Sequence, residues 1–332
     1  MSDELSFNHE AVLLNEAVAA VLGVKSLPNN DNESLQVSGI YVDATFGRGG
    51  HSRLLLSQLA DDAQLIVFDK DPTAISVAEQ LASTDSRVKI VHDSFATLTN
   101  SLAAMGITQV DGLMADLGIS SPQIDDGSRG FSFMRDGAVD MRMDTSRGQS
   151  VSEWLEQVDD ETLANVLYEF GEERHSRRIA RAIKAMDSYT STLELAEVIK
   201  VAHPNWQRGK HPATQSFQAM RIFINNELGD VESFLQQSIP VIKAGGPLAV
   251  ISFHSLEDRL IKQFLQRHSK GRYPEDENLP IRPDRPRYFG KPKRVGPSKA
   301  EIATNPRSRS AWLRSATRTD IVANVLDSEN NK

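Results

Sequence analysis

The chain has 332 residues, 39% hydrophobic and 25% charged, which is typical of one large globular domain or two smaller ones and excludes collagen, coiled coil and wholesale disorder. It contains no cysteine, which excludes disulfides, thiolate zinc sites and cysteine nucleophiles, and its net charge of −8 argues against a surface that attracts nucleic acid everywhere. No apolar run reaches the roughly 20 residues of a membrane-spanning helix, and residues 1–10 carry acids where a signal peptide would carry lysines, so we expect a cytoplasmic protein.

Strand-like and helix-like stretches alternate from Ile40 onward, which is the pattern of a parallel sheet with crossover helices. Between the first four predicted strands lie three predicted helices, Ser52–Leu59, Pro72–Ala82 and Phe95–Met105. The predicted strands are Ile40–Phe46, Gln64–Asp69, Arg87–Val91, Val110–Asp116 and Pro247–Phe253. The sequence therefore predicts an open, doubly wound α/β sheet.

The alternation breaks after Asp116 and resumes only near Leu248. Residues 128–148 indicate a loop, Val151–Phe170 has apolar side chains at helical spacing, and a further helix is expected after Ser191, with Glu194 completing a capping box. We predict a small helical insertion over residues 135–212. The sheet domain is then discontinuous, formed by residues 1–134 and 213–332, and helices are expected through Asn226 and over Val231–Lys243.

A basic segment follows over residues 270–318, with thirteen Lys/Arg and only five Asp/Glu in a chain of net charge −8. This asymmetry favours a localised contact with a polyanion, although a solvated surface loop is an alternative from charge alone. The many prolines between Gly271 and Pro306 make regular structure improbable there. Ser310–Ala316 is predicted as a short last strand, and Asp327–Lys332 as a frayed end.

The first candidate for chemistry is a glycine-rich turn between the first strand and its helix, at Gly47, Gly49 and Gly50. Glycines let the backbone approach a ligand closely, and the free N–H groups at a helix start favour a carboxylate or phosphate. The spacing is not that of the dinucleotide fingerprint, so a purely structural turn is the alternative.

Two further candidates follow the next strands. Asp69 ends the second strand, where an acid can accept both hydroxyls of an adenosine ribose, whereas Asp71 precedes Pro72 and is expected to cap a helix. Phe95, just after the third strand, could lie against a purine or belong to the core. We assign Asp69 to the ligand and Asp71 to the helix.

The fourth strand ends in the polar turn of Asp116, Ser120, Ser121, Pro122 and Gln123. Ligands of open α/β sheets bind beyond the carboxyl ends of the strands, so this turn is expected to face the same crevice as Gly49 and Asp69. An enzyme that methylates an exocyclic amine places hydrogen-bond acceptors for the amine at such a turn. The nitrogen lone pair is delocalised into the ring, which makes the amine a poor nucleophile, so the main task of the site is to position it.

Several strings together resemble the small-subunit methyltransferase H family of bacterial ribosomal RNA methyltransferases, also called MraW. They are His9-Glu-Ala-Val-Leu-Leu14, Val42-Asp-Ala-Thr-Phe-Gly-Arg-Gly-Gly-His51, Asp116-Leu-Gly-Ile-Ser-Ser-Pro-Gln123, Arg129-Gly-Phe-Ser-Phe-Met-Arg135, Asp140-Met-Arg-Met-Asp144, His211-Pro-Ala-Thr-Gln-Ser-Phe-Gln-Ala-Met-Arg221, Asn226-Glu-Leu228 and Ser252-Phe-His-Ser-Leu-Glu-Asp258. The strings span nearly the whole chain, and their order and spacing carry the resemblance.

The resemblance implies a class I, Rossmann-like fold that uses S-adenosylmethionine to methylate N4 of a cytosine, position 1402 of 16S rRNA, in the small ribosomal subunit. Carried over by position, the cofactor contacts fall on Gly49, Gly50, His51, Asp69, Phe95, Asp116 and Gln123. Asp116, Ser120, Ser121 and Pro122 are then expected to orient the amine. No metal, membrane or DNA partner is expected, and the oligomeric state is left open, with a homodimer among the options.

Other parts of these strings allow two interpretations each. Arg129, Arg135 and Arg142, interleaved with Phe131 and Phe133, could hold phosphates or form an ordered network with nearby aspartates. His254 could cap the next helix or touch the target nucleotide. Residues 282–294, with Tyr288 and Phe289, are the main candidate for the rRNA backbone. The rival functions are a ribosome assembly factor without catalysis, and methylation of DNA or of another rRNA amine.

Overall fold

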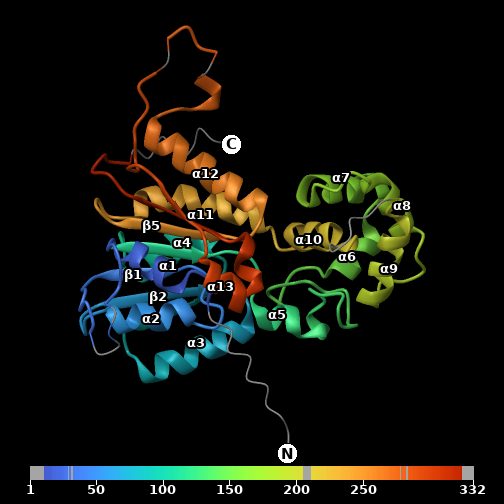
Figure 1. Ribbon diagram of the computed structural model, residues 1–332, viewed down its shortest axis with the longest axis horizontal. Coiled ribbons are helices and arrows are strands. Elements are labelled where there is room, and N and C mark those ends of the chain that lie inside the picture. The colour runs from blue at the N-terminus through green and yellow to red at the C-terminus, as the bar shows by residue number, and fades with distance from the viewer. Residues whose placement is uncertain are drawn as a thin grey trace, which may run out of the picture. The chain divides into compact units, whose positions relative to one another are not determined.

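The computed structural model describes residues 11–28, 30, 33–204, 211–276, 278–281 and 283–323. It contains two compact units, both drawn in Figure 1. The sheet unit comprises Met1–Gly118 and Asp230–Lys332, and the helical unit comprises Ile119–Gly229. These boundaries lie outside the predicted 135–212 on both sides, because Ile119, Phe131 and Phe217 pack in the core of the helical unit.

The sheet unit is built on seven strands in the order β3-β2-β1-β4-β5-β7-β6. The five parallel strands are β1 (Ile40–Asp43), β2 (Gln64–Asp69), β3 (Val88–His92), β4 (Gly112–Asp116) and β5 (Pro247–Ser252). Antiparallel β7 (Trp312–Thr317) pairs with β5, and β6 (Lys293–Val295) pairs with β7. The strand order reverses between β1 and β4, which confirms the predicted doubly wound α/β class.

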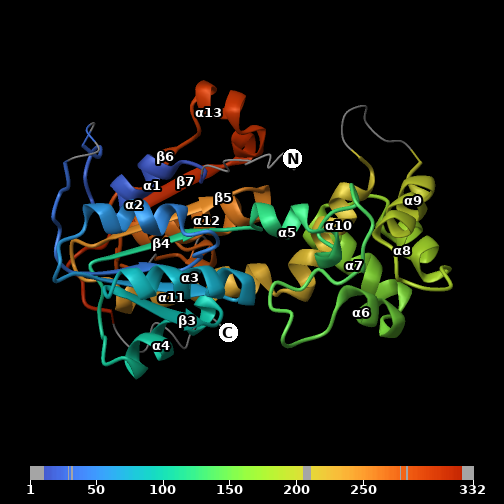
Figure 2. The same ribbon diagram turned by 90° about the horizontal axis from the view of Figure 1, so that it is seen from below.

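Helices cover both faces of this sheet (Figures 1 and 2). On one face, Ile66 and Phe68 of β2 pack toward α4 (Leu98–Ala104), α11 (Glu227–Val241) and α12 (Ser255–Lys270). On the other, Leu65 and Val67 pack toward α1 (Leu14–Val21), α2 (Gly50–Gln58) and α3 (Pro72–Thr84). Successive side chains of a strand point to opposite faces of the sheet and pack in different cores, as expected for parallel strands that are buried on both faces.

Local signals explain where several of these helices begin. The Asp71 side chain accepts a hydrogen bond from the Thr73 amide at 2.9 Å and Pro72 occupies the first turn of α3, which confirms the predicted cap. A short 3₁₀ turn, Phe95–Thr97, precedes α4. The structure also contains α1, for which the sequence analysis made no prediction.

The helical unit has its own apolar core, formed by side chains such as Trp154, Leu167 and Ile183. The stretch predicted as one helix over Val151–Phe170 is two, because Ser150 and Asp159 each cap a new helix. Ser191 caps the next predicted helix by accepting from the Glu194 amide at 3.2 Å. The helices are α5 (Ser121–Asp125), α6 (Val151–Gln157), α7 (Asp160–Gly171), α8 (Ser176–Lys184), α9 (Thr192–Ala202) and α10 (Ala213–Ile224).

The expectation of no regular structure between Gly271 and Pro306 is wrong. Strand β6 gains its hydrogen bonds from β7, and Ser298 caps α13 (Lys299–Thr304) by accepting from the Glu301 amide at 3.0 Å. Pairing with a distant strand is not visible in local composition. The predicted frayed end, Asp327–Lys332, and the first two residues of the His9–Leu14 string lie outside the described residues. None of the helices in the described ranges has the length and apolarity to cross a membrane.

Candidate functional site

The glycine-rich turn leaves β1 at the carboxyl edge of the sheet and is fixed to both neighbouring strands. The amide of Ala44 donates to the Met114 carbonyl and that of Phe46 to the Phe68 carbonyl, each at 2.9 Å. Gly47 and Gly49 have φ of 55° and 73°, a left-handed conformation that favours glycine. A Cβ on Gly49 would lie 2.6 Å from the Phe46 ring. Gly49 provides no side-chain cap for α2, so the positive end of this helix faces the turn.

Asp69 closes the turn from β2. Its Oδ2 accepts a hydrogen bond from the Gly47 amide at 2.7 Å, and its Oδ1 accepts from the Asp71 amide at 2.9 Å. Burial raises the pKa of this carboxyl, and backbone hydrogen bonds from Asp71, Gly47 and Lys70 oppose that shift. A carboxylate has about four lone-pair positions, so these bonds leave room for a hydroxyl of a ligand.

Asp116 reaches the same turn from the end of β4. Its amide donates to Thr45 Oγ1 at 2.5 Å, and its Oδ2 lies 3.7 Å from His51 Nδ1. The side chain is 23% exposed, but Oδ1 is buried and has no hydrogen-bond partner among the described residues. Burial, followed by repulsion from Asp43 and Glu257, raises the pKa of Asp116 well above its usual range.

His51 places an acceptor, rather than a cation, beside Asp116. Its Nε2 lies 3.1 Å from the Val12 carbonyl, which can only accept, so Nε2 carries the proton and Nδ1 does not. Burial lowers the pKa of His51 to about 4, so the ring is neutral at pH 7. His51 therefore adds no positive charge that would favour the ionised form of Asp116.

Asp43 is a buried carboxyl that the sequence analysis did not select. It is 1% exposed, and it accepts hydrogen bonds from Ser52 Oγ at 2.6 Å and from the Thr45 amide at 3.1 Å. Because Thr45 also holds the Asp116 amide, Asp43 supports the turn that carries Asp116. An acid at the end of an otherwise apolar strand, Tyr41-Val-Asp43, is the signal that could have identified it.

Replacing Asp43 by asparagine is expected to flatten the pH dependence of stability. Burial raises the pKa of Asp43 to about 7 from 3.8, so the native state binds this proton more tightly than the unfolded chain does. Stability is therefore greatest below the unfolded pKa and is lost as pH rises toward 7, by up to about 4 kcal/mol. Urea unfolding between pH 4 and 8 measures the difference. Asp61→Asn, which removes an exposed carboxylate, is the control, and equal slopes in wild type and Asp43→Asn would contradict the expectation.

The remaining predicted side chains lie at two other places. Phe95 follows β3 at the carboxyl edge and is partly buried, with its ring edge-on to Phe234 at 5.3 Å. Ser120, Ser121, Pro122 and Gln123 belong to the helical unit, where Gln123 Oε1 accepts a hydrogen bond from the Ser120 amide at 2.9 Å. The structure thus brings the glycine turn, His51, Asp69 and Asp116 together within the sheet unit, and the Ser120–Gln123 turn belongs to the helical unit.

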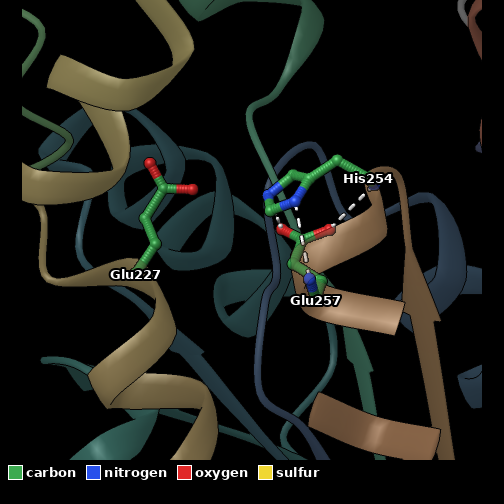
Figure 3. Close-up of side chains that lie close together, drawn as sticks. All are labelled: Glu227, His254 and Glu257. Atoms are coloured by element: carbon green, nitrogen blue, oxygen red, sulfur yellow. Dashed lines mark hydrogen bonds and ion pairs between the residues drawn. The ribbon is translucent and has the colours of Figure 1, made fainter. Parts of the chain in front are cut away.

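His254 caps α12, as one of its two interpretations expects. Its Nδ1 accepts from the Glu257 amide at 3.5 Å, and its Nε2 lies 3.0 Å from Glu257 Oε1. Figure 3 shows His254 and Glu257 in contact at the helix start. Glu257 Oε2 also accepts from the Phe253 amide at 2.9 Å. Figure 3 also labels Glu227, which belongs to the helical unit. The Glu227 carboxylate forms an ion pair with Arg221 at 2.7 Å.

The arginines of residues 128–148 shape their own loop. Arg142 forms a two-point ion pair with Asp140 at 2.7 and 2.9 Å, as the network interpretation expects. Arg129 instead donates to the Met143 carbonyl at 2.9 Å, and Arg135 donates to the Asp125 carbonyl at 2.5 Å. These contacts hold the loop together, as the network interpretation expects for Arg142.

The basic segment divides its cations between the interior and the surface. Tyr288 and Phe289 are each 1% exposed and belong to the sheet core, so the expectation that they accompany an RNA contact is wrong. Arg285 pairs with Asp276 at 2.9 Å, and Arg314 with Asp258 at 2.7 Å. The exposed cations include Lys291, Lys293, Arg294, Lys299 and Arg309, with Arg294 stacked 3.3 Å over Trp312; Arg282 lies outside the described residues.

Comparison with known proteins gives one consistent result. The sequence profile of the MraW methylase family matches residues 6–319. A protein named ribosomal RNA small subunit methyltransferase H, from Psychrobacter arcticus, is 86% identical over 96% of this chain and 97% of its own length. The Acinetobacter baylyi protein of the same name is 55% identical over 94% of this chain and 99% of its own. Among solved structures, an rRNA methylase from Streptococcus thermophilus aligns over 92% of this chain and 93% of its own, with 11% identity and a TM-score of 0.38.

The family match covers both units and extends from the N-terminal helix α1 to the last strand β7. It includes the glycine turn, Asp69 and Asp116, whose geometry is described above. The chain therefore belongs to the MraW methylase family and is a methyltransferase.

Proposed function

We propose that the chain transfers a methyl group from S-adenosylmethionine to N4 of a cytosine in 16S rRNA, position 1402, of the small ribosomal subunit. The names of the relatives, ribosomal RNA small subunit methyltransferase H, support the rRNA substrate. A protein that acts on this substrate is proposed to be located in the cytoplasm. We propose no membrane or DNA partner. The observation that carries the cofactor assignment is the chemistry around Asp116.

The residues of the sheet unit fit this cofactor. Its sulfonium and ammonium groups are both positive, and Asp116 offers, beside a neutral histidine, a buried oxygen that has no hydrogen-bond partner within the described part of the chain. A cationic ligand would stabilise the ionised form of this acid. Gly47 leaves open space where a Cβ would stand, so a ligand can approach the backbone there.

Each predicted residue has a defined part in binding. Asp69 accepts the ribose hydroxyls, and Phe95 lies against the adenine. Gly50, at the start of α2, presents its backbone amide to the carboxylate of the methionine part, which the helix N-terminus favours. Gly49, whose own amide donates to the Phe46 carbonyl at 2.7 Å, contributes a backbone without a side chain. His51, through Nδ1, and Gln123 complete the proposed set of cofactor contacts.

When bound, the cofactor supplies an electrophilic methyl group on a positively charged sulfur. The cytosine amine is a weak nucleophile because its lone pair is delocalised into the ring. Asp116, Ser120, Ser121 and Pro122 would therefore act by accepting its N–H groups and aligning nitrogen, methyl carbon and sulfur. Transfer would leave S-adenosylhomocysteine, and a nearby acceptor or water would take the proton that the methylated nitrogen loses.

A methyl-transfer assay on free 16S rRNA and on 30S particles, followed by nucleoside mass spectrometry, tests this proposal. We expect N4-methylcytosine to form only in the presence of S-adenosylmethionine and active protein. The assay uses rRNA from a strain that lacks the gene, so that the target is unmodified. A methyl group on another nucleoside would show that the protein catalyses a different reaction. No methylation of either substrate would contradict the proposal.

A further inference from the structure

Asp230, on α11, connects two loops at the carboxyl edge of the sheet. It is 7% exposed, and its Oδ2 accepts a hydrogen bond from Ser94 Oγ at 2.6 Å and forms an ion pair with Lys70. Lys70 directly follows Asp69, and Ser94 directly precedes Phe95. One buried carboxylate therefore joins the chain segments that carry the residues proposed for the ribose and the adenine.

Ser94 links Asp230 to the backbone around Phe95. Its Oγ donates to Asp230 and accepts from the Ala96 amide at 3.0 Å, while its own amide donates to Asp93 at 2.8 Å. The hydroxyl can do both because it has one proton and two lone pairs. The 3₁₀ turn that begins at Phe95 is thus set in place by the acid on α11.

The same face of α11 holds the rest of this loop. Phe234 lies edge-on to Phe95, with ring centroids 5.3 Å apart. Gln237 donates to the Ala96 carbonyl at 2.6 Å and accepts from the Thr99 amide at 2.7 Å. Asp230, Phe234 and Gln237 recur at the four- and three-residue spacings of one helix face. Figure 2 shows α11 running beside β3 and α4, the elements that flank the loop.

We propose that Asp230 is a positioning residue of the cofactor site, which fixes the separation of Asp69 and Phe95 without touching the cofactor. A nucleoside is rigid enough that its ribose and its base must meet their partners together, so a change in the spacing of the two loops weakens both contacts. This inference rests on the proposed function, because it takes Asp69 and Phe95 as the nucleoside contacts. It assigns Asp230 to binding of the adenosine part and not to the transfer step.

Calorimetry and steady-state kinetics on the full chain test this role. Asp230→Asn retains an acceptor for Ser94 but removes the charge that holds Lys70. We expect the Kd for S-adenosylmethionine and the inhibition constant of free adenosine to rise together by about tenfold. The kcat at saturating S-adenosylmethionine should stay within about twofold of wild type, since the transfer step is untouched. Glu232→Gln, which removes an exposed charge from the same helix, is the matched control and should change neither constant.

Two milder variants keep the test decisive if Asp230→Asn fails to fold. Ser94→Ala and Lys70→Met each remove one of the two contacts, and each is expected to weaken adenosine binding by about threefold or more. In the double variant Lys70→Met/Asp230→Asn, the loss should be smaller than the product of the single losses, because both changes break the same ion pair.

The outcomes separate the two levels of inference. A wild-type protein that binds no S-adenosylmethionine would remove the proposed function itself. A wild type that binds, with Ser94→Ala and Lys70→Met variants that bind S-adenosylmethionine and adenosine equally well, would overturn the role of Asp230 and leave the proposed function standing. A fall in kcat without a change in either binding constant would also overturn it.

Discussion

Replacing Asp116 by alanine is expected to lower kcat/KM for methyl transfer by about 100- to 10,000-fold. The carboxylate lies at the end of β4, and one of its oxygens is buried and accepts no hydrogen bond from any residue that the structure describes. Both proposed ligands carry N–H groups that can donate to this oxygen. The loss should therefore appear in cofactor binding and in the transfer step together. Asp116→Asn retains the shape but not the charge, and we expect it to fall between wild type and alanine.

The pH profile gives a second measurement of the same residue. Burial raises the pKa of Asp116 well above its usual range, so the acid ionises later than an exposed aspartate does. Affinity for a cationic cofactor should rise as pH increases through this pKa, because only the ionised form attracts the charge. Calorimetry of S-adenosylmethionine binding across pH should show this rise in wild type and lose it in Asp116→Asn. A profile that is the same in both proteins would contradict the assignment.

Replacing Asp69 by alanine is expected to weaken S-adenosylmethionine binding by about 5- to 150-fold, or about 1–3 kcal/mol. The change removes the proposed acceptor for the ribose and also leaves the amides of Gly47 and Asp71 without their partner. The glycine turn should therefore lose order as well as a ligand contact. Calorimetry measures the affinity, and hydrogen exchange at residues 46–51 measures the turn.

Two controls separate these effects. Asp69→Asn keeps one oxygen acceptor for a backbone amide, so it should protect the turn better than alanine does while still losing the charged contact. Asp61→Ala removes an exposed carboxylate from the segment just before β2 and should leave the affinity unchanged. An Asp69→Ala protein with wild-type affinity would refute the ribose assignment.

The parallel part of the fold could be predicted because its signals are local. Buried strands contain continuous apolar runs, such as Leu65–Phe68 in β2, and Asp71-Pro72 marks a helix start through two independent preferences. Helix α8 was missed because arginines surround its few buried side chains, Ile179, Ala180 and Ile183. Strand β6 was missed because all three of its residues are exposed and only pairing with β7 makes them a strand.

The site was predictable where the chain itself brings groups to one edge. Asp69 ends β2 and Asp116 ends β4, the two parallel strands that flank β1. Because the glycine turn follows β1, the strand order brings both carboxyl groups close to this turn. Asp43 and Asp230 were not found, since their contacts to Thr45, Ser52, Lys70 and Ser94 depend on how separate segments pack. The prediction for Tyr288 and Phe289 was wrong because it also depended on packing. Their basic neighbours in sequence suggested an exposed surface, whereas both rings are buried in the core of the sheet unit.

The division of the chain into units also sets an order for its synthesis. The helical unit is one continuous stretch, Ile119–Gly229, so all of its core has been synthesised before β5 is translated. The sheet cannot be completed until β7, Trp312–Thr317, is available to pair with β5. A nascent chain released before residue 312 would therefore carry a finished insertion on an open-edged sheet, and such an exposed edge invites aggregation.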